Sequence, residues 1–366
     1  MAARHDGSTG ETAATGLHNL LEPRSLIAQF LNYPPYGFRP VDAGGDYPAF
    51  ITGYDLTTTM EWEPTNRVGL ALRRVLGRLL RFRTCFVGTT VSEYALLPSG
   101  LAPTEFAARI TRDAADCSLV IIKDIPVAPV LVGDAAMAYN HALVEACVKA
   151  GYLIVEGQAL AYVPLDFEST ERFFARMPRT RRKDIKRKLR GASALDVQVM
   201  STGAAMFDDD AVLNEFYTLY RNVYAQSTTH FDLLTPEFFR AVLSDPQNGG
   251  VVFTYRMEEG GPLIGYNLCF ERDGMLLDKY VGFAYPQARE HNLYFVSWFK
   301  NLEYALQRGL KYYVAGWTDP EIKRHLGASF TLTQHAVYVR NPLLRCVLSY
   351  FKRYFEADAR WLQRTR

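Results

Sequence analysis

The segment from Gly249 to Arg340 constrains the fold more than any other part of this chain. Short glycine-containing turns separate three apolar runs, so the segment predicts antiparallel strands at 251–256, 262–270 and 275–283. The next run has its apolar residues at helical spacing: Phe295, Phe299, Leu302 and Leu306. Gly309 stands where a left-handed helix cap belongs, and residues 311–316 predict one more strand. This order puts a helix N-terminus, which can hold an anion, just beyond a strand end, and therefore suggests an acyl-transfer site.

A resemblance to a known family rests on three local segments. They are RKDIKRKLRG (182–191), NLYFVSWFKNLEYALQRGLKYYVAG (292–316) and IKRHLGA (322–328). Their order resembles the second half of the GCN5-related N-acetyltransferase (GNAT) fold, and their details are more similar to its two-domain relatives, the FemAB-like aminoacyl transferases and FemAB-type predicted N-acyltransferases. The resemblance implies an α/β (α+β) fold with two GNAT-like domains, each a mixed, mostly antiparallel sheet flanked by helices.

Length and composition are those of an ordinary globular chain. A chain of 366 residues suits two domains, and a net charge of +2 gives no global argument for a nucleic-acid partner. The five cysteines show no metal-ligand spacing and are typical of a reducing compartment. Neither a secretory signal nor a run of ~20 apolar residues is visible. We therefore expect a cytoplasmic protein, with peripheral contact at the inner membrane face as a compatible addition.

The predicted organisation has four parts. Residues 1–24 read as a disordered tail and 25–165 as an N-terminal GNAT-like domain. Residues 166–342 read as the C-terminal acyltransferase domain and 343–366 as an amphipathic helix. Within the first domain, 72–82 is predicted to be a basic amphipathic helix. No residue-level repeat relates the two domains.

The turn at 287–292 is the first candidate donor-binding element. In GNAT enzymes the matching turn holds the pyrophosphate of coenzyme A, and the resemblance places Gln287, Arg289 and Asn292 at the donor. Glu290 and Asn292 stand where small residues are expected, and a carboxylate repels phosphate. Arg289 could compensate as a cationic clamp. The alternative is an ordinary loop before a helix.

Candidate catalytic groups lie on the strands before that turn. Simple alternation predicts that Asp278 and Tyr280 share one face of the third strand, about 7 Å apart, with Tyr266 on the adjoining strand. Asp278 could orient an amine, and Tyr280 could act as an acid or polarise an oxyanion. The alternative is that Asp278 is a structural carboxylate paired with Lys279 or Arg272, and the tyrosines are core residues.

A histidine and a late lysine complete the predicted site. His291 lies at the expected helix start, where a neutral imidazole can act as a general base or merely cap the helix. Lys323 matches a lysine that lies near the donor's phosphate in FemAB-like relatives, with Trp317 at the pocket mouth; a solvated lysine is the alternative. No partner carboxylate at metal spacing accompanies His325 or His335, so no metal is predicted.

The run 179–190 holds eight basic residues and one acid. It predicts a helix with a mostly cationic surface, and its candidate polyanion-binding residues are Arg181, Arg182, Lys186 and Arg187. Three interpretations stay open: a track for the phosphates of tRNA, a patch for anionic lipid, and a solvated face.

The prediction for function is an N-acyltransferase that forms an amide by direct attack of an amine. Nucleophile elbows, phosphate loops and dinucleotide fingerprints are absent from the sequence. The donor is an activated acyl or aminoacyl group on coenzyme A, acyl carrier protein or tRNA, bound as a co-substrate; no tightly bound cofactor is expected. The acceptor is a small-molecule amine or a cell-envelope precursor. The alternative is a non-catalytic module that binds tRNA or an anionic membrane surface through 179–190.

Overall fold

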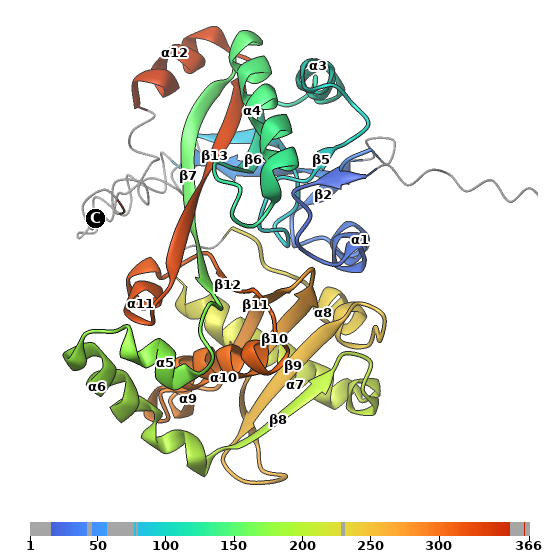
Figure 1. The fold of residues 1–366 in the computed structure, drawn as a ribbon. Coiled ribbons are helices and arrows are strands. Elements are labelled where there is room, and N and C mark those ends of the chain that lie inside the picture. The colour runs from blue at the N-terminus through green and yellow to red at the C-terminus, as the bar shows by residue number, and fades with distance from the viewer. Residues whose placement is uncertain are drawn as a thin grey trace, which may run out of the picture.

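The structure is a computed structural model, which describes residues 16–41, 46–56, 77, 80–227, 231–351 and 362. Two halves, shown at the top and bottom of Figure 1, are joined by long strands that run between them. The elements of the first half are β1 (Leu17–His18), α1 (Arg24–Asn32), β2 (Arg39–Val41), β3 (Ala49–Asp55), β4 (Arg81–Val87), β5 (Leu97–Pro98), α3 (Pro103–Asp113), β6 (Leu119–Pro126), α4 (Gly133–Lys149) and β7 (Leu153–Pro164). Those of the second half are α5 (Thr170–Ala175), α6 (Arg179–Lys188), η2 (Leu189–Ala194), β8 (Asp196–Ser201), η3 (Ala205–Asp208), α7 (Asp210–Gln226), α8 (Pro236–Leu243), β9 (Gly250–Arg256), β10 (Leu263–Arg272), β11 (Met275–Phe283), α9 (Gln287–Glu290), α10 (Leu293–Gln307), β12 (Tyr312–Gly316), α11 (Pro320–His325), β13 (Ser329–Val339) and α12 (Pro342–Phe351).

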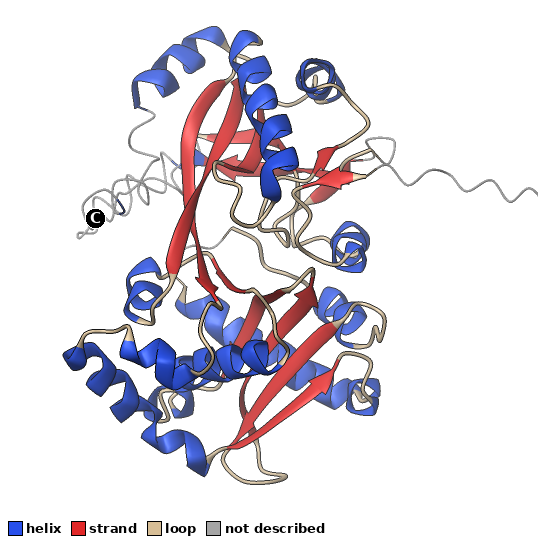
Figure 2. Ribbon diagram, viewed as in Figure 1, coloured by secondary structure: helices blue, strands red, loops and turns tan. Residues whose placement is uncertain are grey.

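One sheet of eleven strands passes through both halves, in the order β2-β3-β4-β6-β13-β7-β12-β11-β10-β9-β8. Its neighbours pair antiparallel except at β4–β6 and β11–β12, which are parallel. Each half therefore has one parallel contact inside an antiparallel sheet, and the two arrangements meet at β7 and β13 (Figure 2). This mixed α/β architecture with two GNAT-like halves confirms the predicted fold class.

Local sequence signals explain most of the elements. Two helices begin at side-chain caps: Ser169 Oγ accepts from the amide of Arg172 at 3.3 Å, and Thr235 Oγ1 accepts from the amide of Phe238 at 3.2 Å. Asp273 and Gly274, both at positive φ, make the tight turn between β10 and β11. Helix α10 starts after Asn292 as predicted.

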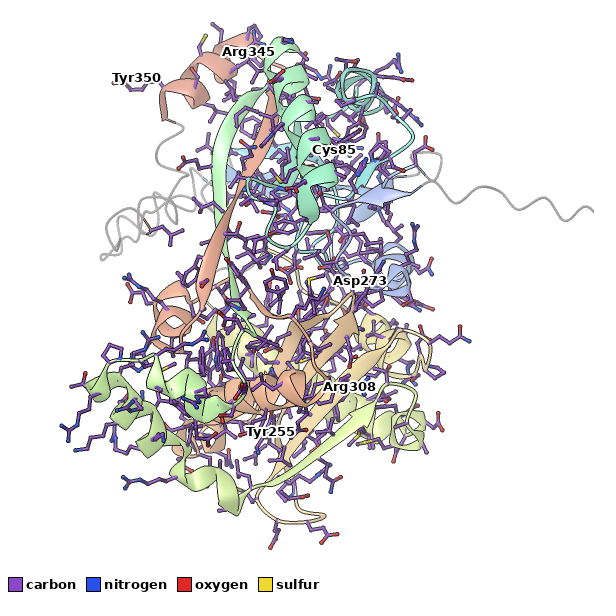
Figure 3. The ribbon with its side chains drawn as sticks, viewed as in Figure 1. Cys85, Tyr255, Asp273, Arg308, Arg345 and Tyr350 are labelled. Carbon is purple, nitrogen blue, oxygen red and sulfur yellow. The ribbon has the colours of Figure 1, made fainter. Side chains whose placement is uncertain are left out.

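The helices cover the C-terminal sheet on two faces. Helices α7 and α8 pack on one face, with Phe216, Phe238 and Tyr266 in a shared core. Helices α5, α6 and α10 cover the other face around Leu276, Phe299 and further apolar residues. Side chains also fill the space between the halves (Figure 3), so a site in this region depends on the whole chain.

Two predictions about organisation need correction, and a third falls mostly outside the described residues. The disordered tail was expected to reach residue 24, but β1 pairs with β5 and Glu22 is fully buried; residues 1–15 lie outside the described residues. Most of the predicted helix at 72–82 also lies outside them, and its last two residues begin β4. Strand β13, which was assigned to the C-terminal domain, inserts between β6 and β7. Strand β13 pairs with strands that are far away in the sequence. Such pairing is not encoded in a local segment, so it could not be predicted from one.

The predicted C-terminal helix at 343–366 is present as α12 as far as Phe351; beyond it only Leu362 is described. Its outer side carries Leu343 and Tyr350, which are 77% and 76% exposed. Tyr350 extends away from the fold at one end of the molecule (Figure 3).

Candidate active site

The candidate site lies where β11 and β12 separate. The two strands pair only from Met275 to Leu277, against Tyr312 to Val314. Beyond this point β11 continues along β10, whereas Gly316 pairs with β7. We call this point of separation, bounded by Asp278 and Gly316, the notch. Past the notch, β12 no longer pairs with β11, so a ligand can hydrogen-bond to the β11 backbone there.

A β-bulge reverses the predicted facing of the strand residues. In the register with β10, Asp278 pairs with Cys269 and Tyr280 pairs with Leu268, so Lys279 is the extra residue. The prediction that Asp278 and Tyr280 share a face is therefore wrong. Asp278 faces α10, whereas Tyr280 faces α7 and α8. A bulge cannot be read from alternation, because alternation assumes that it is absent.

The Asp278 carboxylate is held by surrounding donors. It accepts hydrogen bonds from Tyr313 OH at 2.8 Å, Asn301 Nδ2 at 2.9 Å and Asn267 Nδ2 at 3.1 Å, and Cys269 Sγ lies at 3.6 Å. Burial raises the pKa of Asp278, and the hydrogen bonds from Asn267 and Tyr313 oppose that shift. Since its lone pairs are largely occupied, Asp278 fits a positioning role better than direct proton transfer.

Tyr266 and Tyr280 do lie on one face, as paired-strand geometry allows. Tyr266 is fully buried against Phe216, with ring centroids 4.5 Å apart. Tyr280 packs edge-on against Phe239 at 5.5 Å. Neither hydroxyl has a hydrogen-bond partner among the described residues, and burial raises the pKa of both phenols well above 10. Tyr266 is a core residue, whereas Tyr280 is partly exposed and can meet a ligand.

Lys323 is a buried amine beside the notch. It lies on α11 and is 5% exposed. Its Nζ donates to the carbonyl oxygens of Gly316, at 3.1 Å, and Trp317. Burial lowers the pKa of Lys323 to about 8, against the attraction of nearby carboxylates. An ammonium has three donors, so one stays available for an oxyanion that forms at the notch.

The loop that carries Lys323 has an unusual backbone. Gly316, Thr318 and Asp319 all have positive φ, at 73°, 64° and 45°. For residues with a side chain this conformation costs on the order of 1–3 kcal/mol and is typical of functional sites. The indole of Trp317 is partly buried and packs against the core on the α7 side.

Sequence reasoning missed a buried charge cluster next to the notch. Lys279 Nζ forms ion pairs with Glu22, at 3.3 Å, and with Glu93. The amide of Glu93 also donates to Glu22 Oε1 at 2.6 Å. Glu22 comes from the start of the chain and Glu93 from the loop after β4, so three distant segments meet. We call Glu22, Glu93 and Lys279 the carboxylate cluster. The one sequence signal for this cluster was a lysine in the middle of a mostly apolar strand.

The turn before α10 does not offer amides to a phosphate. Residues 287–290 form α9, and the amides of all five residues from Ala288 to Asn292 donate to nearby backbone carbonyls. Arg289 donates to Gln226 Oε1 at 2.6 Å and stacks on Tyr285. Gln287 is exposed, and His291 is half-buried at the end of α9. The donor roles predicted for Gln287, Arg289 and Asn292, and the base role of His291, stay predictions, but this geometry does not favour coenzyme A.

The basic run forms α6, as predicted, but one of its cations points inward. Arg181 donates to the carbonyls of Arg324 and His325 at the end of α11. The polyanion-binding role predicted for Arg181 stays a prediction, but these contacts do not favour it. Lys186 and Arg187 are exposed, Arg187 pairs with Asp184 at 2.8 Å, and Arg182 is half-buried. Helix α6 thus lies directly against the helix that carries Lys323.

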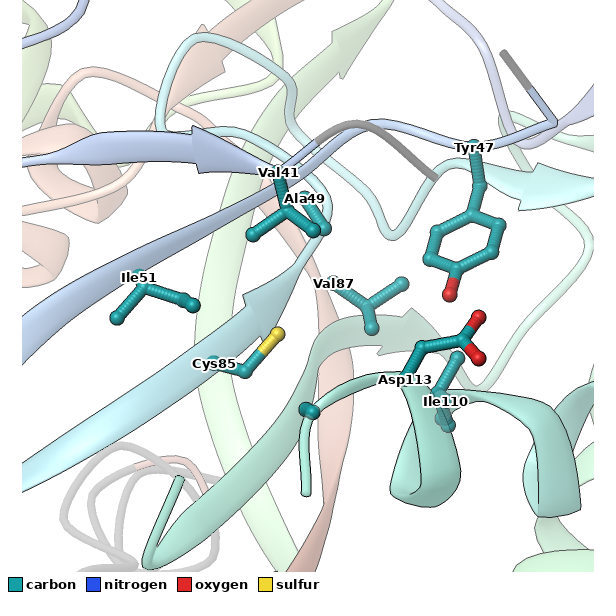
Figure 4. Close-up of a pocket in the computed structure, with 9 residues that line it drawn as sticks. Val41, Tyr47, Ala49, Ile51, Cys85, Val87, Ile110 and Asp113 are labelled. Carbon is teal, nitrogen blue, oxygen red and sulfur yellow. The ribbon is translucent and has the colours of Figure 1, made fainter. Parts of the chain in front are cut away.

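The N-terminal half holds a small pocket of a different kind (Figure 4). Its walls are mostly apolar, and the Tyr47 hydroxyl lies near Asp113 at one end. Burial raises the pKa of the lining thiol, Cys85, to about 12, so it is not an activated nucleophile.

Within the described residues, no group of acidic, histidine and cysteine side chains could hold a metal ion. None of the described helices is both long and apolar enough to cross a membrane.

The sheet order and the separated parallel strands define a GNAT-like fold with two halves. The FemAB-like family model, described as peptidoglycan biosynthesis/recognition, matches residues 135–364. The chain therefore belongs to the FemAB-like family. No curated protein matches it.

Solved structures agree on the fold at low sequence identity. L-PGS from Bacillus licheniformis is similar with a TM-score of 0.51 and 10% identity, over 91% of this chain and 98% of that one. The C-terminal domain of a putative lysylphosphatidylglycerol synthetase from Agrobacterium fabrum gives 0.52 and 12%, over 88% and 90%. FemX gives 0.48 and 11%, over 89% and 98%.

Proposed function

We propose that this protein transfers an acyl or aminoacyl group from an activated carrier to an amine, at the notch between β11 and β12. The observation that carries the proposal is the buried Lys323 ammonium. Two of its donors are used by the carbonyls of Gly316 and Trp317, which holds the nitrogen at the point where the strands separate and leaves a third donor for a ligand.

The reaction needs no covalent enzyme intermediate. The amine nitrogen attacks the carbonyl carbon of the donor, so a C–N bond forms and the carbonyl oxygen becomes an oxyanion. Lys323 donates a hydrogen bond to that oxyanion in a site shielded from water, where such an interaction has its largest effect. The bond from carbon to the carrier then breaks as a proton moves from nitrogen to the leaving atom. Positioning by the β11 edge supplies the remaining catalysis.

Two features favour a polyanionic carrier over coenzyme A. The amides of residues 288–292 are already engaged, and the Glu290 carboxylate is exposed beside them. The exposed cations of α6 lie next to α11, so a carrier held there reaches the notch with its acylated end. An aminoacyl-tRNA meets both conditions.

The acceptor is proposed to be an amine of the cell envelope. Support comes from the family description, peptidoglycan biosynthesis/recognition, and from the lysylphosphatidylglycerol synthetase named among the similar folds. A peripheral position at the inner membrane face would bring the protein to such acceptors.

The test is a transfer assay with separate donors. Purified protein is incubated with pooled aminoacyl-tRNAs, acyl-coenzyme A or acyl carrier protein, each with amine acceptors from envelope precursors. Amide products are detected by mass spectrometry. We expect product with aminoacyl-tRNA at a rate that Lys323→Met lowers about 10²–10³-fold and that Lys300→Met, at an ion pair on α10, leaves unchanged. Product from acyl-coenzyme A alone would overturn the carrier assignment. No product from any donor, with tRNA still bound, would favour the non-catalytic binding module instead.

A further inference from the structure

The carboxylate cluster has two acidic groups for one lysine, and burial raises the pKa of Glu22 against the attraction of Lys279. Two buried carboxylates, with side chains 0% and 2% exposed, share the ammonium of Lys279. Arg272, a further cation beside them, donates to the backbone carbonyl of Glu22 rather than to its carboxylate. A buried charge without a partner is strongly destabilising, so a fold keeps one only where something compensates for it.

Individual oxygen atoms of the cluster lack hydrogen-bond partners. Oε2 of Glu22 and Oε2 of Glu93 are buried and have no hydrogen-bond partner within the described parts of the chain. The same holds for the Tyr280 hydroxyl on the same side of the sheet. Buried polar atoms in native proteins are nearly always paired, and two orphaned carboxylate oxygens on one shared lysine indicate a missing ligand that donates hydrogen bonds.

The cluster faces the proposed point of transfer. Glu93 Oε1 lies 3.9 Å from the position that a Cβ on Gly316 would occupy, and the carbonyl oxygen of Asp278 lies 3.6 Å from that same position. Glu93 therefore lies at the notch itself, on the side opposite to the Asp278 carboxylate. Burial lowers the pKa of Lys323, and the negative charge of Glu93 opposes this shift.

The cluster also borders solvent on one side. Asp232 and Tyr280 are both partly exposed. Burial raises the pKa of Tyr280, and the negative charges of Asp232, Glu22 and Glu93 add to the shift.

We propose that the carboxylate cluster binds the acceptor as a primary ammonium and that Glu93 takes its first proton; this rests on the proposed function. The ammonium donates to the free oxygens of Glu22 and Glu93 and completes the charge balance. One proton passes to Glu93, which frees the nitrogen lone pair for attack. The second proton leaves the nitrogen after the C–N bond has formed and goes to the leaving oxygen of the donor ester. Glu93 then releases its proton to solvent.

The acceptor class follows from this geometry. A primary ammonium has three N–H donors, enough for both orphaned carboxylate oxygens. A quaternary ammonium has none, and an alcohol has no charge to complete the balance. The site therefore selects a primary amine.

A binding test separates this proposal from transfer activity. Thermal unfolding of the full chain is followed with n-butylammonium chloride and, at equal ionic strength, with tetramethylammonium chloride. We expect a saturable rise in Tm with butylammonium only, and loss of that rise in Glu93→Gln. Equal responses to both salts, or an unchanged response in Glu93→Gln, would overturn the site.

A stability comparison excludes a merely structural ion pair. Glu93→Gln leaves Glu22 with Lys279, one charge against one, so ligand-free Tm should equal or exceed that of the wild type. Lys279→Met leaves two carboxylates unpaired and should lower Tm strongly. If Glu93→Gln lowers Tm as much as Lys279→Met, Glu93 is structural and the proposal fails.

The third test measures transfer activity, once a donor and an acceptor have been identified. Glu93→Gln should lower kcat at least a hundredfold while the KM for the donor stays unchanged. Unchanged transfer in Glu93→Gln would overturn the proton-acceptor role and leave the proposed function intact. Absence of transfer in the wild type, with the butylammonium response still dependent on Glu93, would overturn the proposed function and leave the ammonium site standing.

Discussion

The sheet has two parallel strand pairs, β4–β6 and β11–β12. They have the same topology, but the side chains around them differ in charge. In the N-terminal half, β4 and β6 pair from Thr84 to Val87, and apolar side chains close the space around them. The charges that follow, Lys123 and Asp124, form a one-to-one ion pair, and Lys123 also donates to the carbonyl of Thr89. In the C-terminal half the strands separate after three residue pairs, and one lysine faces two glutamates.

This difference indicates which of the two strand pairs can hold a ligand. A balanced ion pair inside an apolar wall is complete without a ligand, whereas an unbalanced cluster beside separated strands is not. The N-terminal pair also contributes a part to the other site, because the loop after β4 carries Glu93 to the notch. The N-terminal half therefore contributes a side chain to the proposed site of the C-terminal half.

The largest expected effect comes from removing the shared cation. Lys279→Met should lower the free energy of unfolding by about 3–5 kcal/mol, because two buried carboxylates then have no partner. Chemical denaturation followed by circular dichroism measures the change. Lys300→Met, at an exposed pair with Glu303, should cost about 0–1 kcal/mol. Similar decreases in both variants would show that the cluster is not sensitive to charge balance.

Next in size is the removal of the proposed oxyanion donor. Lys323→Met should lower the transfer rate about 10²–10³-fold without unfolding the chain. In the wild type the rate should fall as pH rises through about 8, because the ammonium then gives up its proton. Burial favours the neutral amine in the folded state, so stability should rise with pH above about 8 until the unfolded lysine also gives up its proton, and Lys323→Met should remove this rise. A pH–rate profile that is flat through about 8 would contradict the role.

A smaller effect is expected at the basic helix. Charge reversal of Lys183, Lys186 and Arg187, which are exposed on α6, should weaken tRNA binding and reduce its salt slope by about 0.7–0.9 for each phosphate that is no longer neutralised. The reversal Arg112→Glu, on the N-terminal helix α3, is the matched control and should leave binding unchanged. Filter binding over a salt series measures both, and equal slopes for all variants would exclude α6 as the carrier surface.

The smallest expected effect concerns the reactivity of a cysteine beside the N-terminal strand pair, β4 and β6. Cys85 lies in the apolar pocket with its thiol pKa raised to about 12, so iodoacetamide at about pH 8 should leave it unmodified in the folded protein. Cys346, which is exposed on α12, should react quickly. Peptide mass mapping distinguishes the two. Rapid labelling of Cys85 would show that the N-terminal half opens, and the contrast between the halves would weaken.

The sequence by itself determined the local elements of this protein. Glycine turns, caps such as Ser169 and Thr235, and apolar spacing along α10 act within a few residues, so strands β9 to β12 and their helices were predicted close to their observed bounds. Lys323 was also predicted as a donor-binding residue from its local segment, and that role stays a prediction. The family resemblance, which depends on the same local order, is confirmed.

Only the tertiary structure decided which side chains meet. The bulge at Lys279 turned Tyr280 away from Asp278, Arg181 turned inward to cap α11, and β13 crossed into the other half. The carboxylate cluster joins Glu22, Glu93 and Lys279, which are separated by up to 257 positions. Its members have no common local pattern, because burial and charge balance are properties of the packed chain and are not encoded in any short segment.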